Sequence, residues 1–258
     1  MSSYKITPKR SSLWQKTWYI LKPFVVYMIV KTCAMLTLAM LIPMLPVKGI
    51  DLWVEEHSYQ LSAVVNAVAS LVGAGFLLED FLKEVSVSGE IDIDAGLWKR
   101  LWQSFKNGLC RCDQKMAAGL VGCAAGGVVL AFSFNYLIAW VSGLLKIESQ
   151  KYENVEAIQY SVPLWLGLIL YGLISPVVEE MVFRGVLYNR MKRFYRVPRC
   201  VILTALLFGI FHANLPQFLY GTCMGILMAL SYEKLKCLGA PVVFHMAANI
   251  SVFLMSYV

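Results

Sequence analysis

The chain has 258 residues, of which 59% are hydrophobic and 15% charged, and its formal net charge is +7. A composition this apolar excludes an ordinary soluble domain and predicts an all-α bundle of transmembrane helices, a multi-pass protein of the cell membrane. The positive charge does not indicate a nucleic-acid partner, because the lysines and arginines gather in particular loops between apolar segments, as membrane topology requires. The lipid bilayer is the expected surrounding.

About seven apolar segments are candidate membrane spans. The first follows a basic N-terminus, but it is about a full span long and lacks a clear small-residue cleavage site, so an uncleaved span is expected rather than a signal peptide. Pro216 separates the fifth and sixth segments, which allows their turn to lie below the membrane surface. The segments are roughly residues 23–44, 61–79, 117–141, 162–188, 200–215, 217–232 and 240–257.

Between the second and third segments, residues 96–110 have the pattern of an amphipathic helix. Trp98 and Trp102 fall on its apolar face, and Lys99 and Lys106 lie on the other side. A basic, tryptophan-rich helix is expected to lie in the headgroup layer of the membrane. The alternative is a helix that packs over the cytoplasmic mouth of the bundle.

The distribution of basic residues predicts the orientation in the membrane. With a cytoplasmic N-terminus, the lysines and arginines outside the spans fall on the cytoplasmic side, except for Lys48, Lys146 and Lys151. The positive-inside rule therefore places the C-terminus outside. Residues 1–160 are predicted to form the N-terminal spans and residues 161–258 the C-terminal core, within one integrated bundle.

The fourth segment carries charges at membrane depth. From Ser161 to Tyr188 its charged residues are Glu179, Glu180 and Arg184. A charge at the bilayer centre costs ~2.5–3.5 kcal/mol on insertion scales, so these three predict a buried functional site. Glu180 and Arg184 have the spacing of an ion pair along a helix, whereas Glu179 is rotated by about 100° from Glu180. We therefore assign Glu179 to chemistry in a cavity and the Glu180–Arg184 pair to holding the helix.

Two further polar pairs lie near the C-terminus. Phe208 and His212 are four residues apart in the fifth segment, and His245 and Asn249 are four apart in the seventh. Side chains at this spacing share a helix face, so His245 and Asn249 point into the same space. Either histidine alone could be a structural hydrogen-bonding group between helices. Two of the chain's three histidines, however, follow the glutamate pair in uncharged segments, which favours a shared site.

The order of these motifs, EExxxR, then FxxxH, then HxxxN, each in a separate apolar segment, resembles the CAAX-protease and bacteriocin-processing family of intramembrane endopeptidases. The resemblance covers roughly residues 162–250, and the string PVVEEMVFRGVLY is similar to the form common in bacterial members. It implies hydrolysis of a peptide bond inside the membrane by a water molecule that a glutamate and a histidine activate.

The resemblance also implies roles for individual residues. Glu179 is expected to act as the general base and His212 to orient the water, since these positions match the family's catalytic glutamate and histidine. His245 and Asn249 are expected to stabilise the oxyanion of the tetrahedral intermediate. The residues expected to support this site are Glu180, Arg184 and Phe208.

A second mechanism uses the same side chains with zinc. Glu179, His212 and His245 could supply three ligands and leave a fourth position open for water. Members of the family have been described both as metalloproteases and as metal-independent glutamate proteases, and the sequence has no HExxH motif. We expect the mechanism without a cofactor, with zinc as the alternative.

Two other functions could use the same residues. Buried acids and histidines could relay protons or ions in a transporter, although no inverted repeat is visible. A member of the family could also act as a non-catalytic membrane scaffold. For the peptidase, the expected substrate is a peptide or a membrane protein, which a cavity facing the cytoplasm would admit from inside.

Overall fold

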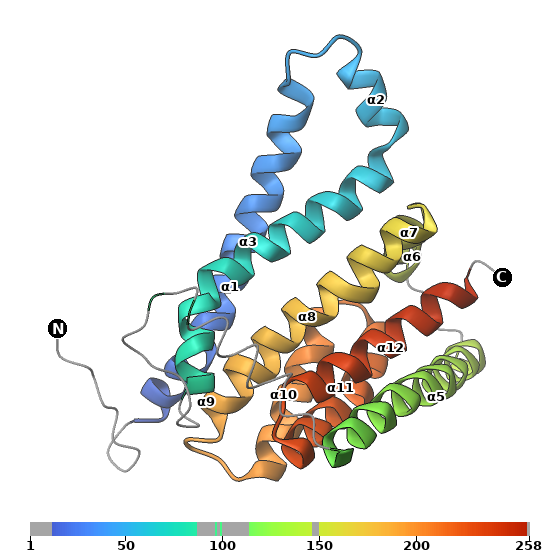
Figure 1. Cartoon of the computed structure of the whole chain (residues 1–258). Coiled ribbons are helices and arrows are strands. Elements are labelled where there is room, and N and C mark those ends of the chain that lie inside the picture. The colour runs from blue at the N-terminus through green and yellow to red at the C-terminus, as the bar shows by residue number, and fades with distance from the viewer. Residues whose placement is uncertain (1–11, 87–95, 97–98, 100–113, 146–149, 257–258) are drawn as a thin grey trace.

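The computed structural model describes residues 12–86, 96, 99, 114–145 and 150–256, and the regular elements in this part of the chain are all helices (Figure 1). The predicted amphipathic helix at 96–110 falls outside the described residues apart from Gly96 and Lys99, so it stays a prediction. The all-α fold class is confirmed.

The long helices pack in pairs along their lengths. α1 and α3 form a hairpin through η1 and α2, α5 packs along α12, and α10 packs along α11 (Figure 1). A short helix, α6, precedes one continuous helix from Leu164 to Met191 that comprises α7, η2, α8, η3 and α9, of which η2 and η3 are π-helical. The bounds are α1 Leu13–Leu41, η1 Ile42–Met44, α2 Ile50–Glu56, α3 Ser58–Ser86, α5 Gln114–Leu145, α6 Gln150–Tyr160, α7 Leu164–Gly167, η2 Leu168–Ile174, α8 Ser175–Glu180, η3 Met181–Tyr188, α9 Asn189–Met191, α10 Val197–Phe211, α11 Leu215–Leu235 and α12 Gly239–Met255.

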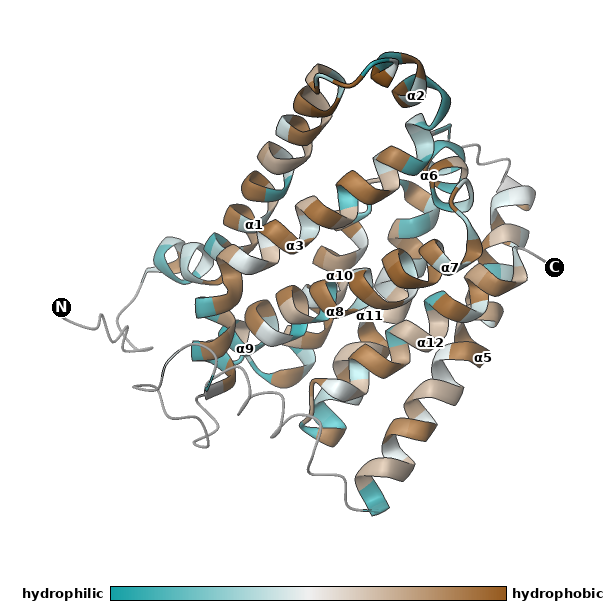
Figure 2. Ribbon diagram, turned by 45° about the horizontal axis from the view of Figure 1, so that its top comes forward, coloured by the Kyte–Doolittle hydropathy of each residue, from teal (hydrophilic) through white to brown (hydrophobic). Residues whose placement is uncertain are grey.

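Within the described residues, four helices are long and apolar enough to cross a membrane, and they correspond to the first four predicted spans. α10 and α12 are shorter apolar helices, and α11, with 21 residues, covers the remaining predicted segment. Hydrophobic residues run along these helices (Figure 2), and many large apolar side chains on α1 and α5 are exposed, as on a lipid-facing surface. The chain is therefore a polytopic helical membrane protein, as predicted.

The second span is longer than predicted, because α3 continues past residue 79 to Ser86. The charged residues after position 79 end the apolar run in the sequence, but they do not end the helix. Asp80 and Glu84 remain helical and accept hydrogen bonds from Arg190 at 2.6 and 3.1 Å.

This ion-pair cluster joins three helices near α9. Arg190 also donates to the carbonyl of Tyr19 on α1 at 2.9 Å, and Arg193 donates to Glu84 at 2.6 Å. Arg190 and Glu84 are both buried. The cluster therefore fixes the α1–α3 hairpin against the end of the helix that carries the glutamate pair.

Glycine at position 127 allows α5 to approach α12 closely. A Cβ built at Gly127 would lie 2.3 Å from the carbonyl oxygen of Phe244, whereas a Cβ at Gly122 would meet nothing within 4 Å. A backbone carbonyl cannot move aside as a flexible side chain can. The approach therefore depends on the missing side chain at Gly127 and positions α12, which carries His245 and Asn249.

We expect Gly127→Ala to destabilise the protein by about 1–3 kcal/mol, because the added methyl group forces α5 and α12 apart. Gly122→Ala is the matched control, since it makes the same change in the same helix where space is open. Thermal unfolding of the detergent-purified variants measures both. Equal unfolding temperatures for the two variants would contradict this account of the α5–α12 contact.

Candidate active site

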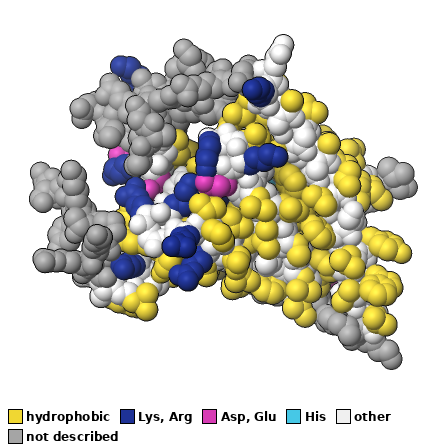
Figure 3. Space-filling view, turned by 90° about the horizontal axis from the view of Figure 1, so that it is seen from below, with side chains coloured by type: hydrophobic (Ala, Val, Ile, Leu, Met, Phe, Trp, Pro, Cys, Tyr) yellow, Lys and Arg dark blue, Asp and Glu magenta, His cyan; other side chains and the backbone are white. Residues whose placement is uncertain are grey.

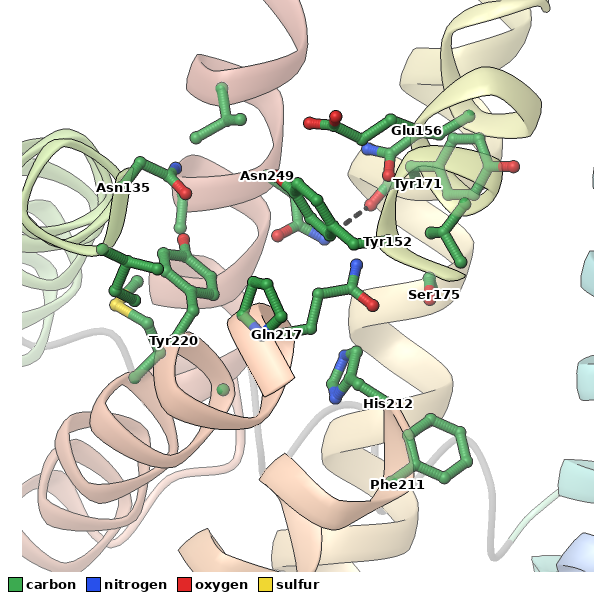
Figure 4. A pocket seen from close by; sticks show the side chains of 18 of the residues that line it. Asn135, Tyr152, Glu156, Tyr171, Ser175, Phe211, His212, Gln217, Tyr220 and Asn249 are labelled. Carbon is green, nitrogen blue, oxygen red and sulfur yellow. Dashed lines mark hydrogen bonds between the residues drawn. The ribbon is translucent and has the colours of Figure 1, made fainter. Parts of the chain in front are cut away.

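A cavity of about 470 Å³ lies among the helices that carry the three motifs, and Glu179, Phe208, His212, His245 and Asn249 all line it. Glu179 lies on α8, Phe208 on α10, and His245 and Asn249 on α12, while His212 directly follows α10. In Figure 4, His212 and Asn249 project into the same space from different helices. The structure thus brings the predicted site residues together, and their catalytic roles stay predictions.

Glu179 is the carboxylate that faces the cavity. Its side chain is 12% exposed, and its Oε1 accepts a hydrogen bond of 2.5 Å from Ser175 Oγ, one helical turn earlier on α8. Ser175 was not predicted as a site residue, although its position four residues before Glu179 was a usable signal. This hydrogen bond fixes one carboxylate oxygen and leaves the other available on the cavity side.

Glu180 and Arg184 are fully buried, at 0% exposure, and form the predicted ion pair. Arg184 Nη1 donates to Glu180 Oε1 at 2.8 Å, and Nη2 donates to the carbonyl of Gly225 on α11 at 2.9 Å. Arg184 therefore links the motif helix to α11. Its guanidinium also lies over the ring of Phe208, 4.9 Å from the centroid.

His245 lies between the two glutamates. Its Nδ1 is 3.0 Å from Glu180 Oε1, and its Nε2 is 3.9 Å from Glu179 Oε2. From the sequence, Glu180 was predicted only to hold the helix together with Arg184. In the structure Glu180 also orients the imidazole of His245, in the way that a buried carboxylate commonly fixes a functional histidine.

His212 is held by the last turn of α10. Its Nδ1 lies 2.9 Å from the carbonyl oxygen of Phe208. A carbonyl oxygen can only accept, so Nδ1 carries the hydrogen and donates it. In the neutral ring, Nε2 then has a free lone pair, which suits a group that accepts a hydrogen bond from water.

The turn after His212 has a strained backbone. Ala213 adopts φ = 58°, in the left-handed region that a residue with a Cβ disfavours by about 1–2 kcal/mol. Asn214 offsets this strain: its Oδ1 accepts from the backbone N–H of Gln217 at 2.9 Å, and its Nδ2 donates to the carbonyl of His212 at 3.1 Å. The turn connects α10 to α11 and holds His212 beside the cavity.

Phe208 separates the two histidines and contacts both. Its ring is edge-on to His212 at a centroid distance of 5.0 Å and to His245 at 5.7 Å. The same ring receives the guanidinium of Arg184. The aromatic position of the FxxxH motif therefore supports three polar side chains at once, which agrees with the supporting role predicted for it.

The side-chain amide of Asn249 makes one hydrogen bond within the protein. Its Nδ2 donates to the carbonyl oxygen of Tyr171 on η2 at 3.0 Å (Figure 4). A side-chain amide nitrogen carries two hydrogens, so one donor remains available for a second acceptor. That second hydrogen is the one that could serve the predicted oxyanion role.

Several lining residues were not predicted from the sequence. Lys31 of α1 reaches the cavity and places its Nζ 5.2 Å from the centroid of the Phe211 ring. A single lysine in an otherwise apolar first span was a usable signal for this position. Tyr152, Glu156 and Gln159 of α6 also line the cavity, but their helix is polar and showed no distinguishing motif.

The structure shows how the three candidate zinc ligands are placed. Among the residues that the structure describes, no group of three or more histidine, cysteine, aspartate or glutamate side chains is placed so that it could hold a metal ion. Nδ1 of His212 and Nδ1 of His245 both have hydrogen-bond partners, so Nε2 of each ring is the atom that could bind a metal. Glu179, His212 and His245 line one cavity, but they do not form a ligand set as they stand.

The fold and the cavity are those of a polytopic helical membrane protein with a buried site of glutamate and histidine side chains. Residues 161–251 match the family model described as "Type II CAAX prenyl endopeptidase Rce1-like". The chain is also 27% identical over 203 residues to the "Putative membrane peptidase YdiL" of Bacillus subtilis (strain 168), an alignment that covers 77% of this chain and 72% of that protein. No solved structure matches the chain. Residues 161–251 are therefore similar to the Rce1-like domain of the CAAX-protease and bacteriocin-processing family, and the resemblance of the motifs to this family is confirmed.

Proposed function

We propose that this protein is an intramembrane endopeptidase that hydrolyses peptide bonds with a water molecule activated by Glu179 and His212. The observation that carries the proposal is the shared cavity, which is lined by the mostly buried carboxylate of Glu179 and by the imidazoles of His212 and His245, from three separate parts of the chain. The Rce1-like domain and the membrane-peptidase relative support the same class of enzyme. The substrate is a peptide or a membrane protein.

The proposed reaction begins with water held between Glu179 and Nε2 of His212. Glu179 removes a proton as the water oxygen forms a bond to the peptide carbonyl carbon. The resulting oxyanion accepts hydrogen bonds from the second amide hydrogen of Asn249 and from Nε2 of His245. The role of His245 requires a hydrogen on Nε2 that points toward the oxyanion. The carbon–nitrogen bond then breaks, and the proton taken up by Glu179 passes to the leaving amine.

The remaining polar residues position these groups. Glu180 holds Nδ1 of His245, and Arg184 compensates the charge of Glu180 while it anchors the helix to α11. Ser175 holds one oxygen of Glu179 and leaves the other free for water. We further propose that the N-terminus is cytoplasmic and the C-terminus outside, which is supported by the bias of the basic residues.

Cleavage by metal-free protein tests both the activity and its mechanism. We expect the purified protein in liposomes to cleave members of a peptide library, and to keep its rate after treatment with a strong zinc chelator, because in the proposed mechanism side chains alone activate the water. Mass spectrometry of the products measures the cleavage. Activity that disappears with the chelator and returns only with zinc would overturn the metal-free mechanism and favour zinc held by Glu179, His212 and His245.

The same experiment separates the other candidate functions. A non-catalytic scaffold would cleave no peptide under any of these conditions. A transporter would cleave none either, but it would move protons or ions across the liposome membrane. Either result would overturn the proposed peptidase activity.

A further inference from the structure

The two ends of the helix bundle differ in charge. Basic side chains gather on the face of the bundle shown in Figure 3, which is the lower end in Figure 1. Several of them lie on the loops that follow α9 and α11 or at the adjacent helix ends, and their side chains are exposed: Lys192, Arg193, Arg196, Arg199, Lys234 and Lys236. The positive-inside rule assigns this end to the cytoplasm.

The cavity reaches the molecular surface at the other end of the bundle. Ala139 on the last third of α5 and Glu153 on α6 both line the cavity, and both are exposed. α6 lies at the same end as α7, away from α9 (Figure 1). None of the basic residues named for the lower end lines the cavity. The described mouth of the cavity is therefore opposite the basic end.

α6 forms one wall of this mouth. Of its residues, Tyr152, Glu153, Val155, Glu156, Gln159 and Tyr160 all line the cavity. Tyr152 is hydrogen-bonded to Glu156, and its burial together with this carboxylate raises the pKa of the Tyr152 hydroxyl, so the group stays protonated and donates at neutral pH. Hydroxyl, amide and carboxylate groups at the mouth supply the hydrogen-bond donors and acceptors that an extended polypeptide backbone needs. An acyl chain has no hydrogen-bonding groups and would gain nothing from them.

We propose that substrate enters the cavity from the non-cytoplasmic side, past α6, and that it is an extended polypeptide segment exposed on that side of the membrane. The inference rests on the proposed peptidase function and names the substrate class of that site. It replaces the expectation of a cavity that faces the cytoplasm. The difference arises because sequence predicts which loops are cytoplasmic, whereas the side on which a cavity opens depends on how the helices pack.

Cysteine accessibility tests the side of entry without depending on catalysis. The seven native cysteines are replaced, and single cysteines are introduced as Ser142→Cys or Gln159→Cys at the mouth and as Arg199→Cys at the basic end. In right-side-out membrane vesicles, we expect a membrane-impermeant maleimide to label the first two variants at least ten times faster than the third. In inverted vesicles, the order is expected to reverse. The opposite pattern, or equal labelling of all three, would overturn the proposed entry side.

A second measurement connects entry to the reaction. Peptide added outside right-side-out vesicles should be cleaved, and a bulky maleimide on Gln159→Cys should reduce that cleavage at least fivefold, whereas the same reagent on Arg199→Cys should not. Cleavage that occurs only with inverted vesicles would overturn the inference while leaving the peptidase function intact. If the cysteines are labelled as expected but no preparation cleaves peptide, the peptidase function would be overturned. The position of the mouth would then still be established.

Discussion

Glu179→Gln is expected to lower kcat by about 10³-fold or more, within the range that general-base catalysis contributes. Glutamine has nearly the same shape, and its amide oxygen can still accept the hydrogen bond from Ser175 Oγ. It cannot take a proton from water. Because Glu179 faces the cavity and is not part of the Glu180–Arg184 pair, the variant should keep its fold, and the KM for a cleaved peptide should change little.

Glu55→Gln on α2 is the matched control, since it makes the same chemical change at an exposed acid that does not line the cavity. Peptide cleavage measures kcat and KM for both variants, and thermal unfolding shows whether Glu179→Gln is folded. A folded Glu179→Gln protein with more than a tenth of the wild-type kcat would exclude Glu179 as the base. The peptidase proposal would then need a different catalytic group.

Hydrophobicity and charge were sufficient to predict the long helices. Apolar runs bounded by charged loops predict membrane helices because the bilayer leaves few alternatives for a backbone without water. The end of the apolar run placed the end of the second span too early, because charged residues such as Asp80 and Glu84 are typical of a loop outside the membrane. In the structure both side chains accept hydrogen bonds from Arg190, which is more than a hundred residues away and compensates their charge. Pairing over such a distance has no local signature.

The site was predictable to the extent that it depends on helical geometry. The rotation of about 100° between adjacent residues was enough to separate a cavity-facing Glu179 from a buried Glu180, and the structure agrees in their exposure. The contact between Glu180 and His245 was not predictable, because it depends on how α12 packs against α8. The cavity contribution of α6 was missed for the same reason, since nothing in a polar helix indicates which surface it covers.

The Glu180–Arg184 pair gives the largest expected effect on stability. Glu180→Ala would leave the guanidinium of Arg184 fully buried with a backbone carbonyl and an aromatic ring but without the carboxylate that is hydrogen-bonded to it. Breaking a buried ion pair in this way costs about 3–5 kcal/mol. We therefore expect Glu180→Ala to accumulate at a much lower level than the wild type and to unfold at a markedly lower temperature in detergent.

The double variant Glu180→Ala/Arg184→Met separates the two roles of Glu180. It removes both charges and keeps an apolar side chain of similar length, so most of the lost stability should return. The activity should not return, because Nδ1 of His245 has lost the carboxylate that orients it, and we expect kcat to stay about 10–100-fold below wild type. Unfolding temperature and peptide cleavage are measured on the same preparations. A stable double variant with wild-type kcat would show that Glu180 serves only the ion pair, and a double variant as unstable as Glu180→Ala would show that the uncompensated guanidinium was not the cause.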